Sequence, residues 1–258
     1  MTRSRLDAHA ELLALARRGL DWEAPERQRG SMSGARRAAV LVLFGVLDSV
    51  PAASRGPVVG ELDVLLQRRA ATMGHHPGQI SFPGGGVEPS DADAAATALR
   101  EAVEETGLDQ AGVEVLGSLP VLGIPASNNL VTPVLAWWKR VSEVAAIDHR
   151  EAVDVFRMPV ADLLTPDNRV TVVLNRDGRE HRSPAFQVGD ILIWGFTALV
   201  LERMFKALDW AVRPATPGVG RSRSASATSN KTSVGKIHSP GNDKAPNAPP
   251  ASHCGSTH

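Results

Sequence analysis

The chain has 258 residues, among which 28 lysine and arginine residues balance 28 aspartate and glutamate residues. This neutral balance offers no bulk attraction to nucleic acid or to an anionic membrane surface, so neither is expected as a partner. The single cysteine, Cys254, excludes an internal disulfide and is typical of a reducing compartment. The sequence also lacks an apolar run of roughly 20 residues and a signal-peptide core, which together predict a cytoplasmic protein.

The composition divides the chain into three segments. Residues 1–34 contain an amphipathic helix at 5–19, expected to pack on the outside of the domain, followed by a polar linker. Residues 35–212 carry the apolar strands and helices of the main domain. Residues 213–258 hold six basic residues, one aspartate and almost no large apolar residue. They are expected to form a disordered basic tail, because such a segment cannot bury enough surface to offset its ordering entropy.

The main domain alternates strands with helices. The apolar run at 36–47 predicts a buried strand, and a second strand is expected at 61–67. Later segments predict strands at 113–116, 120–124, 131–138 and 153–157, a hairpin around 176–178, and helices at 160–164 and 196–210. Because Trp137 and Trp138 must lie on opposite faces of their strand, at most one of them is expected in the core.

The central stretch of this domain, residues 78–108, predicts a strand, a glycine turn and a helix. Ser90 and Asp91 are suitable N-cap residues, and Gly107 is suited to the left-handed position after the helix. The small, mostly apolar face expected to pack inward consists of Ala95, Leu99, Ala102, Val103 and Thr106.

Three carboxylates are expected on the opposite face of this helix. Glu101, Glu104 and Glu105 lie at positions i, i+3 and i+4, which places their Cβ atoms about 5–6 Å apart. Mg²⁺ is commonly bound by one or two carboxylates together with waters and substrate phosphates, so this cluster predicts a metal site. The preceding Gly84, Gly85 and Gly86 let the backbone approach a phosphate or offer carbonyls to the ion. An ordinary solvated acidic face is the alternative, and the joint pattern with the glycines favours the metal site.

Two arginines follow the second strand. Arg68 and Arg69 end it beside the loop that leads to Gly78, where they could contact phosphate oxygens. Ordinary surface charges are the alternative interpretation.

Two adjoining motifs resemble those of a known family. Residues 100–108, Arg-Glu-Ala-Val-Glu-Glu-Thr-Gly-Leu, resemble the second half of the Nudix hydrolase signature. Where that signature places its first glutamate, eight residues before Arg100, this chain has Ala92, flanked by Asp91 and Asp93. The upstream residues resemble the additional motif of the coenzyme A pyrophosphatase branch, which tolerates this departure; the matching positions are Leu65, Leu66, Arg69, Gly78, Ile80, Phe82, Pro83, Gly84 and Gly85.

The resemblance implies a fold and a reaction. The fold would be α/β, a Nudix-type α/β/α sandwich around a mixed β-sheet. The reaction would be metal-dependent hydrolysis of the pyrophosphate bond in coenzyme A or acyl-CoA, giving 3′,5′-ADP and 4′-phosphopantetheine or its acyl form.

The resemblance also implies roles for particular residues. Mg²⁺ or Mn²⁺ would be held by Glu101, Glu104 and Glu105, and Arg100 would keep these carboxylates oriented. The general base would be Glu104 or a carboxylate outside the signature, for which Glu151 and Asp154 are the options. The substrate would contact Arg69, Arg68, the three glycines and the polar loop at Asn128, although that loop is equally consistent with a simple turn.

Two other functions stay open. The same fold could act on another nucleoside diphosphate derivative, such as a nucleotide sugar or an oxidised nucleotide. Ala92 at the first glutamate position also suggests a non-catalytic Nudix-like module that binds nucleotide or a partner protein, although the intact Glu101, Glu104 and Glu105 argue against it. The expected partner is a small-molecule substrate, with a homodimer as an additional option.

Overall fold

A computed structural model describes residues 7–22, 32, 34–47, 59–70, 78–125, 127–147, 152–176 and 179–210. The chain divides into two units, Met1–Pro214 and Ala215–His258, and every element below belongs to the first. The predicted basic tail at 213–258 lies outside the described residues. No helix in the described part of the chain is long and apolar enough to cross a membrane.

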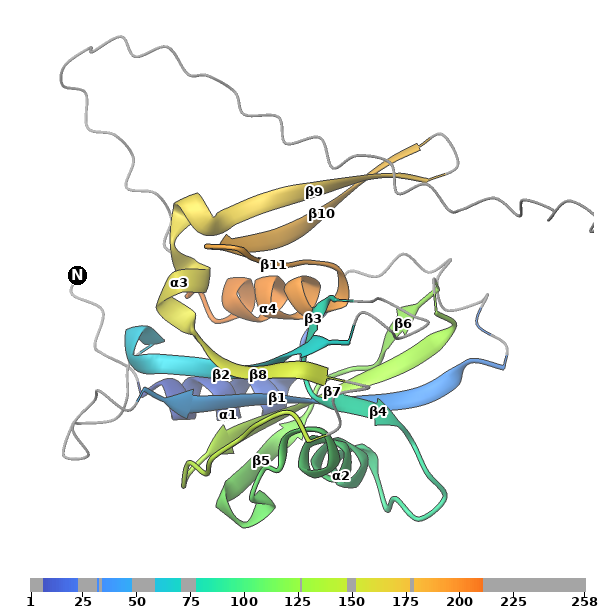
Figure 1. Cartoon of the computed structure of the whole chain (residues 1–258), viewed down its shortest axis with the longest axis vertical. Coiled ribbons are helices and arrows are strands. Elements are labelled where there is room, and N and C mark those ends of the chain that lie inside the picture. Colours follow the sequence, from blue (N-terminus) through green and yellow to red (C-terminus); the bar gives the residue numbers. More distant parts are fainter. Residues whose placement is uncertain are drawn as a thin grey trace, which may run out of the picture. The chain divides into compact units, whose positions relative to one another are not determined.

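An eight-stranded mixed sheet forms the centre of the first unit (Figure 1). Its strands are β1 (Arg36–Val46), β2 (Leu62–Arg69), β3 (Ile80–Ser81), β4 (Gly84–Gly86), β5 (Val113–Ser118), β6 (Leu122–Ile124), β7 (Asn129–Trp138) and β8 (Ala152–Pro159). The main path runs β3-β2-β1-β7-β5, with β4 beside β1, β6 beside β7 and β8 beside β2. Strands β1 and β7 are parallel, and the other pairs are antiparallel.

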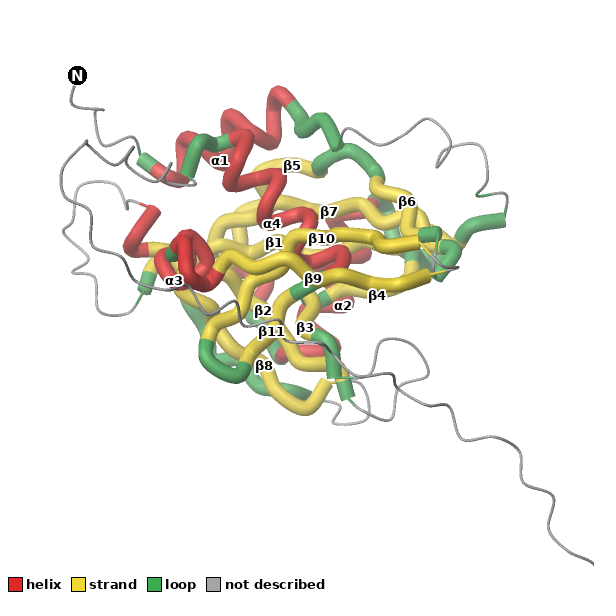
Figure 2. Tube along the Cα trace, turned by 90° about the horizontal axis from the view of Figure 1, so that it is seen from above, coloured by secondary structure: helices red, strands yellow, loops and turns green. Residues whose placement is uncertain are grey.

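Helices cover both faces of this sheet (Figures 1 and 2). They are α1 (Ala8–Arg18), α2 (Ala94–Thr106), α3 (Val160–Leu164) and α4 (Gly195–Ala207), with short 3₁₀ turns η2 (Val59–Glu61), η3 (Gln110–Gly112) and η4 (Pro166–Asn168). Alternate residues of β1 enter two different cores. Leu41 and Leu43 pack with α2, whereas Val42 and Phe44 belong to the larger core that includes residues of α1 and α4. The predicted α/β/α sandwich around a mixed sheet is confirmed.

The two tryptophans of β7 correct one expectation. Trp137 and Trp138 do lie on opposite faces, since each belongs to a different core. Both are nevertheless buried, with exposures of 8% and 2%. The prediction that at most one would be buried was wrong because helices cover the sheet on both sides.

A second, three-stranded antiparallel sheet packs against α4. It contains β9 (Arg169–Arg176), β10 (Arg179–Val188) and β11 (Ile191–Ile193), and β9 and β10 form the predicted hairpin. Phe186 of β10 meets Phe205 of α4 edge to face, with ring centroids 6.2 Å apart. The sequence predicted the hairpin but not that it would form a separate sheet.

The central sheet opens between β1 and β2. These strands pair with each other only at Phe44–Val46 and Leu62–Val64. Farther along, β1 pairs with β4 and β2 pairs with β3, so the chain from β3 to β4 lies between the separated strands. The Leu41 amide donates to the Pro83 carbonyl at 2.8 Å and fixes this insertion. The three glycines therefore form the short strand β4 rather than the predicted turn, because they pair with β1 at the opening of the sheet, beside α2.

The ends of α2 differ partly from expectation. Asp93, rather than Ser90 or Asp91, is the N-cap, and its carboxylate accepts a hydrogen bond from the Ala96 amide at 2.8 Å. Gly107 ends the helix in the left-handed conformation as predicted, with a φ of 70°.

The buried face of α2 is rotated from the predicted one. Val103 is 36% exposed, whereas Thr97, Ala98 and Glu105 are buried. Ala98 and Ala102 face the sheet, and their small side chains let α2 pack closely on β1 and β4. A larger side chain at either position would hold the helix away from these strands. This rotation carries Glu105 inward, which corrects the expectation that all three glutamates lie on the outer face.

Candidate active site

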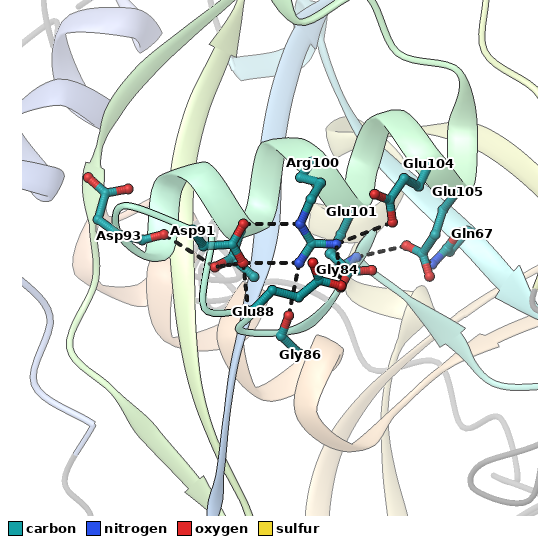
Figure 3. Close-up of polar contacts among 11 residues, drawn as sticks. Gln67, Gly84, Gly86, Glu88, Asp91, Asp93, Arg100, Glu101, Glu104 and Glu105 are labelled. Atoms are coloured by element: carbon teal, nitrogen blue, oxygen red, sulfur yellow. Dashed lines mark hydrogen bonds and ion pairs between the residues drawn. The ribbon is translucent and has the colours of Figure 1, made fainter.

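The glycine strand β4 packs directly against α2 (Figure 3). A Cβ atom on Gly85 would lie 2.5 Å from the Glu101 carboxylate, so that carboxylate occupies the space a side chain would fill. At Gly84, where φ is 151°, a Cβ would lie 2.3 Å from the Ala39 carbonyl oxygen. A Cβ at Gly86 would meet nothing within 4 Å. Two of the three glycines are therefore required by close packing, one against a carboxylate and one against backbone.

Arg100 links β4 to the helix (Figure 3). Its guanidinium donates to both Asp91 oxygens at 3.0 Å and to the Gly86 carbonyl at 3.0 Å. It also contacts Glu101 and Glu104, each at 3.2 Å, which is the pairing expected from the sequence. A planar guanidinium with five N–H donors suits such a fork of acceptors. Arg100 therefore orients two of the predicted metal-binding carboxylates.

Asp91 is a site residue that sequence reasoning did not assign. Besides Arg100, its carboxylate accepts hydrogen bonds from the Glu88 amide at 2.8 Å and from the Thr97 hydroxyl at 2.9 Å. The Arg100 hydrogen bonds hold the pKa of Asp91 well below its usual range. Ala92, at the first glutamate position of the signature, is exposed. Asp91, one residue before that position, thus provides an acidic partner for Arg100. Its place beside Ala92 was the feature of the sequence that could have indicated this role.

Glu105 is 6% exposed and sits between two donors (Figure 3). The Gly84 amide donates to its Oε2 at 2.8 Å, and Gln67 Nε2 donates to the same oxygen at 2.7 Å. Burial raises the pKa of Glu105 from 4.5 to about 7, and the Glu101 charge adds to this rise. The two hydrogen bonds and the charge of Arg69 act in the opposite direction. A carboxyl group in this environment changes its protonation state near neutral pH.

Gln67 was not predicted as a site residue. It lies near the end of β2 and is 1% exposed. The sequence did contain one indication of this role. Between residues 62 and 67, Gln67 and Asp63 are the only polar residues of an otherwise apolar strand.

The two predicted arginines have different positions. Arg69 follows an irregularity in the pairing of β2 with β8, and its charge acts on Glu105. Arg68 alternates to the face of β2 opposite to that of Gln67, where its neighbours across the strands are Ile80 and Asp154. The structure therefore brings Arg69, but not Arg68, toward the carboxylates.

Other predicted residues lie farther from the carboxylates or outside the described structure. Asn128 is exposed, with a φ of 49°, and its carbonyl accepts a hydrogen bond from the Arg36 amide at 3.0 Å. Strand β1 separates it from the glycines of β4, so the structure does not bring it to them. Of the two candidate outer carboxylates, Asp154 is exposed on β8, and Glu151 lies outside the described residues.

The carboxylates present fit a partly hydrated divalent ion. Within the described residues, no three aspartate, glutamate, histidine or cysteine side chains are gathered closely enough to form a complete ion cage. Glu101 and Glu105 are close enough for their charges to interact, and the Glu104 side chain is 58% exposed beside Arg100. Mg²⁺ needs only one or two carboxylates when waters and phosphates complete its shell. The donor set thus suits Mg²⁺ or Mn²⁺ held jointly with a phosphate ligand.

A cavity of about 410 Å³ lies elsewhere and is lined by residues of β9 and β10 and by Glu202 of α4. Because α4 and α2 cover opposite faces of the central sheet, this cavity is not part of the carboxylate site.

The chain is similar to known proteins over this region. The profile of the NUDIX domain family matches residues 51–174. A protein of Cronobacter sakazakii described as "Uncharacterized Nudix hydrolase NudL" is 34% identical over 188 residues, which cover 70% of this chain and 86% of the relative. A protein of Photorhabdus laumondii with the same description is 34% identical over 141 residues, 55% of this chain and 74% of the relative. Among solved structures, a MutT/nudix family protein from Enterococcus faecalis covers 78% of this chain and 74% of its own, with 17% identity and a TM-score of 0.44.

Proposed function

We propose that this chain, which belongs to the Nudix hydrolase family, cleaves the pyrophosphate bond of coenzyme A or of an acyl-CoA. Nudix hydrolases act on pyrophosphate bonds of small molecules and generally use divalent metal ions. In this proposal the products are 3′,5′-ADP and 4′-phosphopantetheine, or the acylated form of the latter.

The coenzyme A assignment rests on the resemblance of residues 65–85 to the coenzyme A pyrophosphatase motif. The described residues of this segment, 65–70 and 78–85, include direct partners of the carboxylate helix. Gly84 of this segment donates to Glu105, and the charge of Arg69 acts on the same carboxylate. A motif in this position can act on the substrate and on the catalytic centre together.

Each site residue has a role in the proposed reaction. Glu101 and Glu105 would hold the cation, with Glu104 as a third ligand or as the general base, and Arg100 would keep Glu101 and Glu104 in place. A divalent ion bound there would supply positive charge to the phosphate oxygens and lower the pKa of a water molecule. Arg69 would bind a phosphate oxygen as the bond breaks. The backbone of Gly84, Gly85 and Gly86 would offer its remaining polar groups to the pyrophosphate or the cation.

Among the described residues we propose Glu104 as the general base. Its side chain is 58% exposed, so it can exchange a proton with solvent after each turnover, whereas Glu105 is buried. The exposed Asp154 is the second option, and Glu151 stays a prediction from the sequence.

The first experiment compares product formation by three forms of the full chain. Wild type, Glu105→Gln and a control, Glu180→Gln, are incubated with coenzyme A and Mg²⁺ or Mn²⁺, and the products are resolved by chromatography. Glu180 is a suitable control because its side chain is 63% exposed on β10, away from α2. The proposal expects 3′,5′-ADP from wild type and from Glu180→Gln, and little from Glu105→Gln.

A parallel incubation with ADP-ribose tests the other diphosphates. Cleavage of ADP-ribose without cleavage of coenzyme A would reject the coenzyme A assignment and keep the reaction class. Cleavage of neither would favour a nucleotide-binding module.

A further inference from the structure

Gln67 has a buried side-chain amide whose hydrogen-bond partner lies outside the sheet, on α2. It is 1% exposed, and its neighbours across the strands are Ser81 of β3 and Val155 of β8. Its side chain instead leaves β2 and reaches α2, where Nε2 donates to Glu105 at 2.7 Å. Burial of an amide disfavours folding unless its polar atoms are satisfied. The position therefore calls for an explanation through Glu105.

The other buried polar residue of β2 provides a contrast. Asp63 is fully buried and contacts Arg157 of the adjacent strand β8 at 2.7 Å, an ion pair within the sheet. Gln67 has no charge to pair in this way, and its buried Oε1 accepts no hydrogen bond from the described part of the chain. A residue selected for stability alone would be a leucine here, with equal bulk and no buried acceptor. The arrangement favours a role for the Gln67 donor.

Both donors to Glu105 meet the same oxygen. The Gly84 amide at 2.8 Å and Gln67 Nε2 at 2.7 Å both contact Oε2. Oε1 receives no hydrogen bond from the residues that the structure describes. An ionised carboxylate can accept several hydrogen bonds, so two on one oxygen fix the rotation of the group and leave the second oxygen available.

We propose that Gln67 is a positioning residue that, with the Gly84 amide, fixes Oε2 of Glu105 and presents Oε1 to the cation. This role rests on the metal-binding part of the proposed function and is independent of which diphosphate is cleaved. Partners that orient a metal-binding carboxylate commonly change metal affinity or activity by roughly 10–100-fold when removed. Gly84 acts through its backbone, so Gln67 is the member of the pair that mutation can remove.

The test measures Mn²⁺ binding to the metal-free full chain in the absence of substrate, by electron paramagnetic resonance of the free ion. Gln67→Leu keeps the bulk and removes the donor, and Gln67→Asn keeps an amide with a shorter reach. The matched control is Thr197→Val. Thr197 is 3% exposed and donates to the Ile80 carbonyl at 3.0 Å, so this change also removes a buried hydrogen bond, in the core on the other face of the sheet.

The expected result separates positioning from stability. Gln67→Leu should weaken Mn²⁺ binding roughly 10–100-fold with no fall in melting temperature, and Gln67→Asn should weaken it as well. Thr197→Val should lower the melting temperature and leave the Mn²⁺ dissociation constant unchanged. With substrate, Gln67→Leu should reduce kcat much more than it changes KM at saturating metal. If Gln67→Leu does not fold, Gln67→Asn provides the comparison with Thr197→Val.

Unchanged Mn²⁺ affinity in the folded Gln67 variants would overturn the positioning role, as would a wild type that binds no Mn²⁺. Failure of the substrate assignment looks different. If coenzyme A is not cleaved but Gln67→Leu still weakens Mn²⁺ binding, the positioning role stands and the substrate proposal falls.

Discussion

Alanine substitution at the three consecutive glycines should give three different phenotypes. At Gly85 the added methyl would lie 2.5 Å from the Glu101 carboxylate, which is the far end of a flexible side chain. That side chain can swing away, so folding should be little affected while Glu101 leaves its position. Displacement of a catalytic group by about 1 Å can reduce activity by about 10²-fold, and we expect a fall in kcat of this order for Gly85→Ala.

At Gly84 the obstacle is backbone. The methyl would lie 2.3 Å from the Ala39 carbonyl oxygen, and the φ of 151° is strained for any residue with a Cβ. Backbone strain of about 1–3 kcal/mol and overpacking of similar size together predict a loss of about 2–6 kcal/mol in the free energy of unfolding for Gly84→Ala.

Gly86 is the control of the series. A Cβ there meets nothing within 4 Å, so Gly86→Ala should be neutral or stabilising by up to about 1 kcal/mol. Urea unfolding of the three metal-free variants, with diphosphate hydrolysis measured in parallel, checks the series. Equal loss of stability at Gly84 and Gly85 would refute the ability of the Glu101 side chain to move aside, and full activity in Gly85→Ala would refute the need for Glu101 at its present position.

Three other measurements test the electrostatics and the tail. Because burial raises the pKa of Glu105 from 4.5 to about 7, its contribution to stability is full below pH 4.5 and is lost as the pH rises to about 7. At pH 8, metal-free Glu105→Gln should therefore have a higher melting temperature than wild type, with a free energy of unfolding larger by up to about 3 kcal/mol. A lower melting temperature for the variant would contradict this. The contribution of Asp91 to stability has the opposite pH dependence, because Arg100 depresses its pKa. This contribution is present above the unfolded pKa near 4 and is lost as the pH falls further. Asp91→Ala should therefore lower the melting temperature at pH 7 more than at pH 2. Deletion of residues 213–258 should leave kcat unchanged, and a large loss would show that the tail takes part in catalysis.

The sequence contained enough information for the elements of the site but not for their relative orientation. The glutamate cluster, the glycine run and the end of α2 at Gly107 follow from local patterns, and the structure places them together. The inward face of α2 does not follow, because its apolar residues are mostly alanines that give little preference for one rotation. Contact with β1 and β4 decides the rotation, with Ala98 and Ala102 inside and Val103 outside.

The residues that were missed share a physical reason. Gln67 and Asp91 are ordinary polar residues in the sequence, and each gains its role from one partner in the folded chain. The partner of Gln67 is 38 residues away, and no periodicity connects β2 with α2. The partner of Asp91 is nine residues away, across the turn that leads into α2. The Gln67 contact depends on where β1 and β2 separate, which is a property of the whole sheet, and the Asp91 contact depends on the geometry of the turn before α2.

The separation of these strands also joins two functions that sequence motifs treat as distinct. The upstream segment, which resembles a substrate motif, provides both the Gly84 amide and the Gln67 side chain. Both reach the carboxylate helix through a single oxygen of Glu105. A mutation at Gln67 or Gly84 should therefore change cation binding as well as hydrolysis. A mutation at Arg69, whose charge acts on Glu105, is expected to change phosphate binding more than the position of that carboxylate.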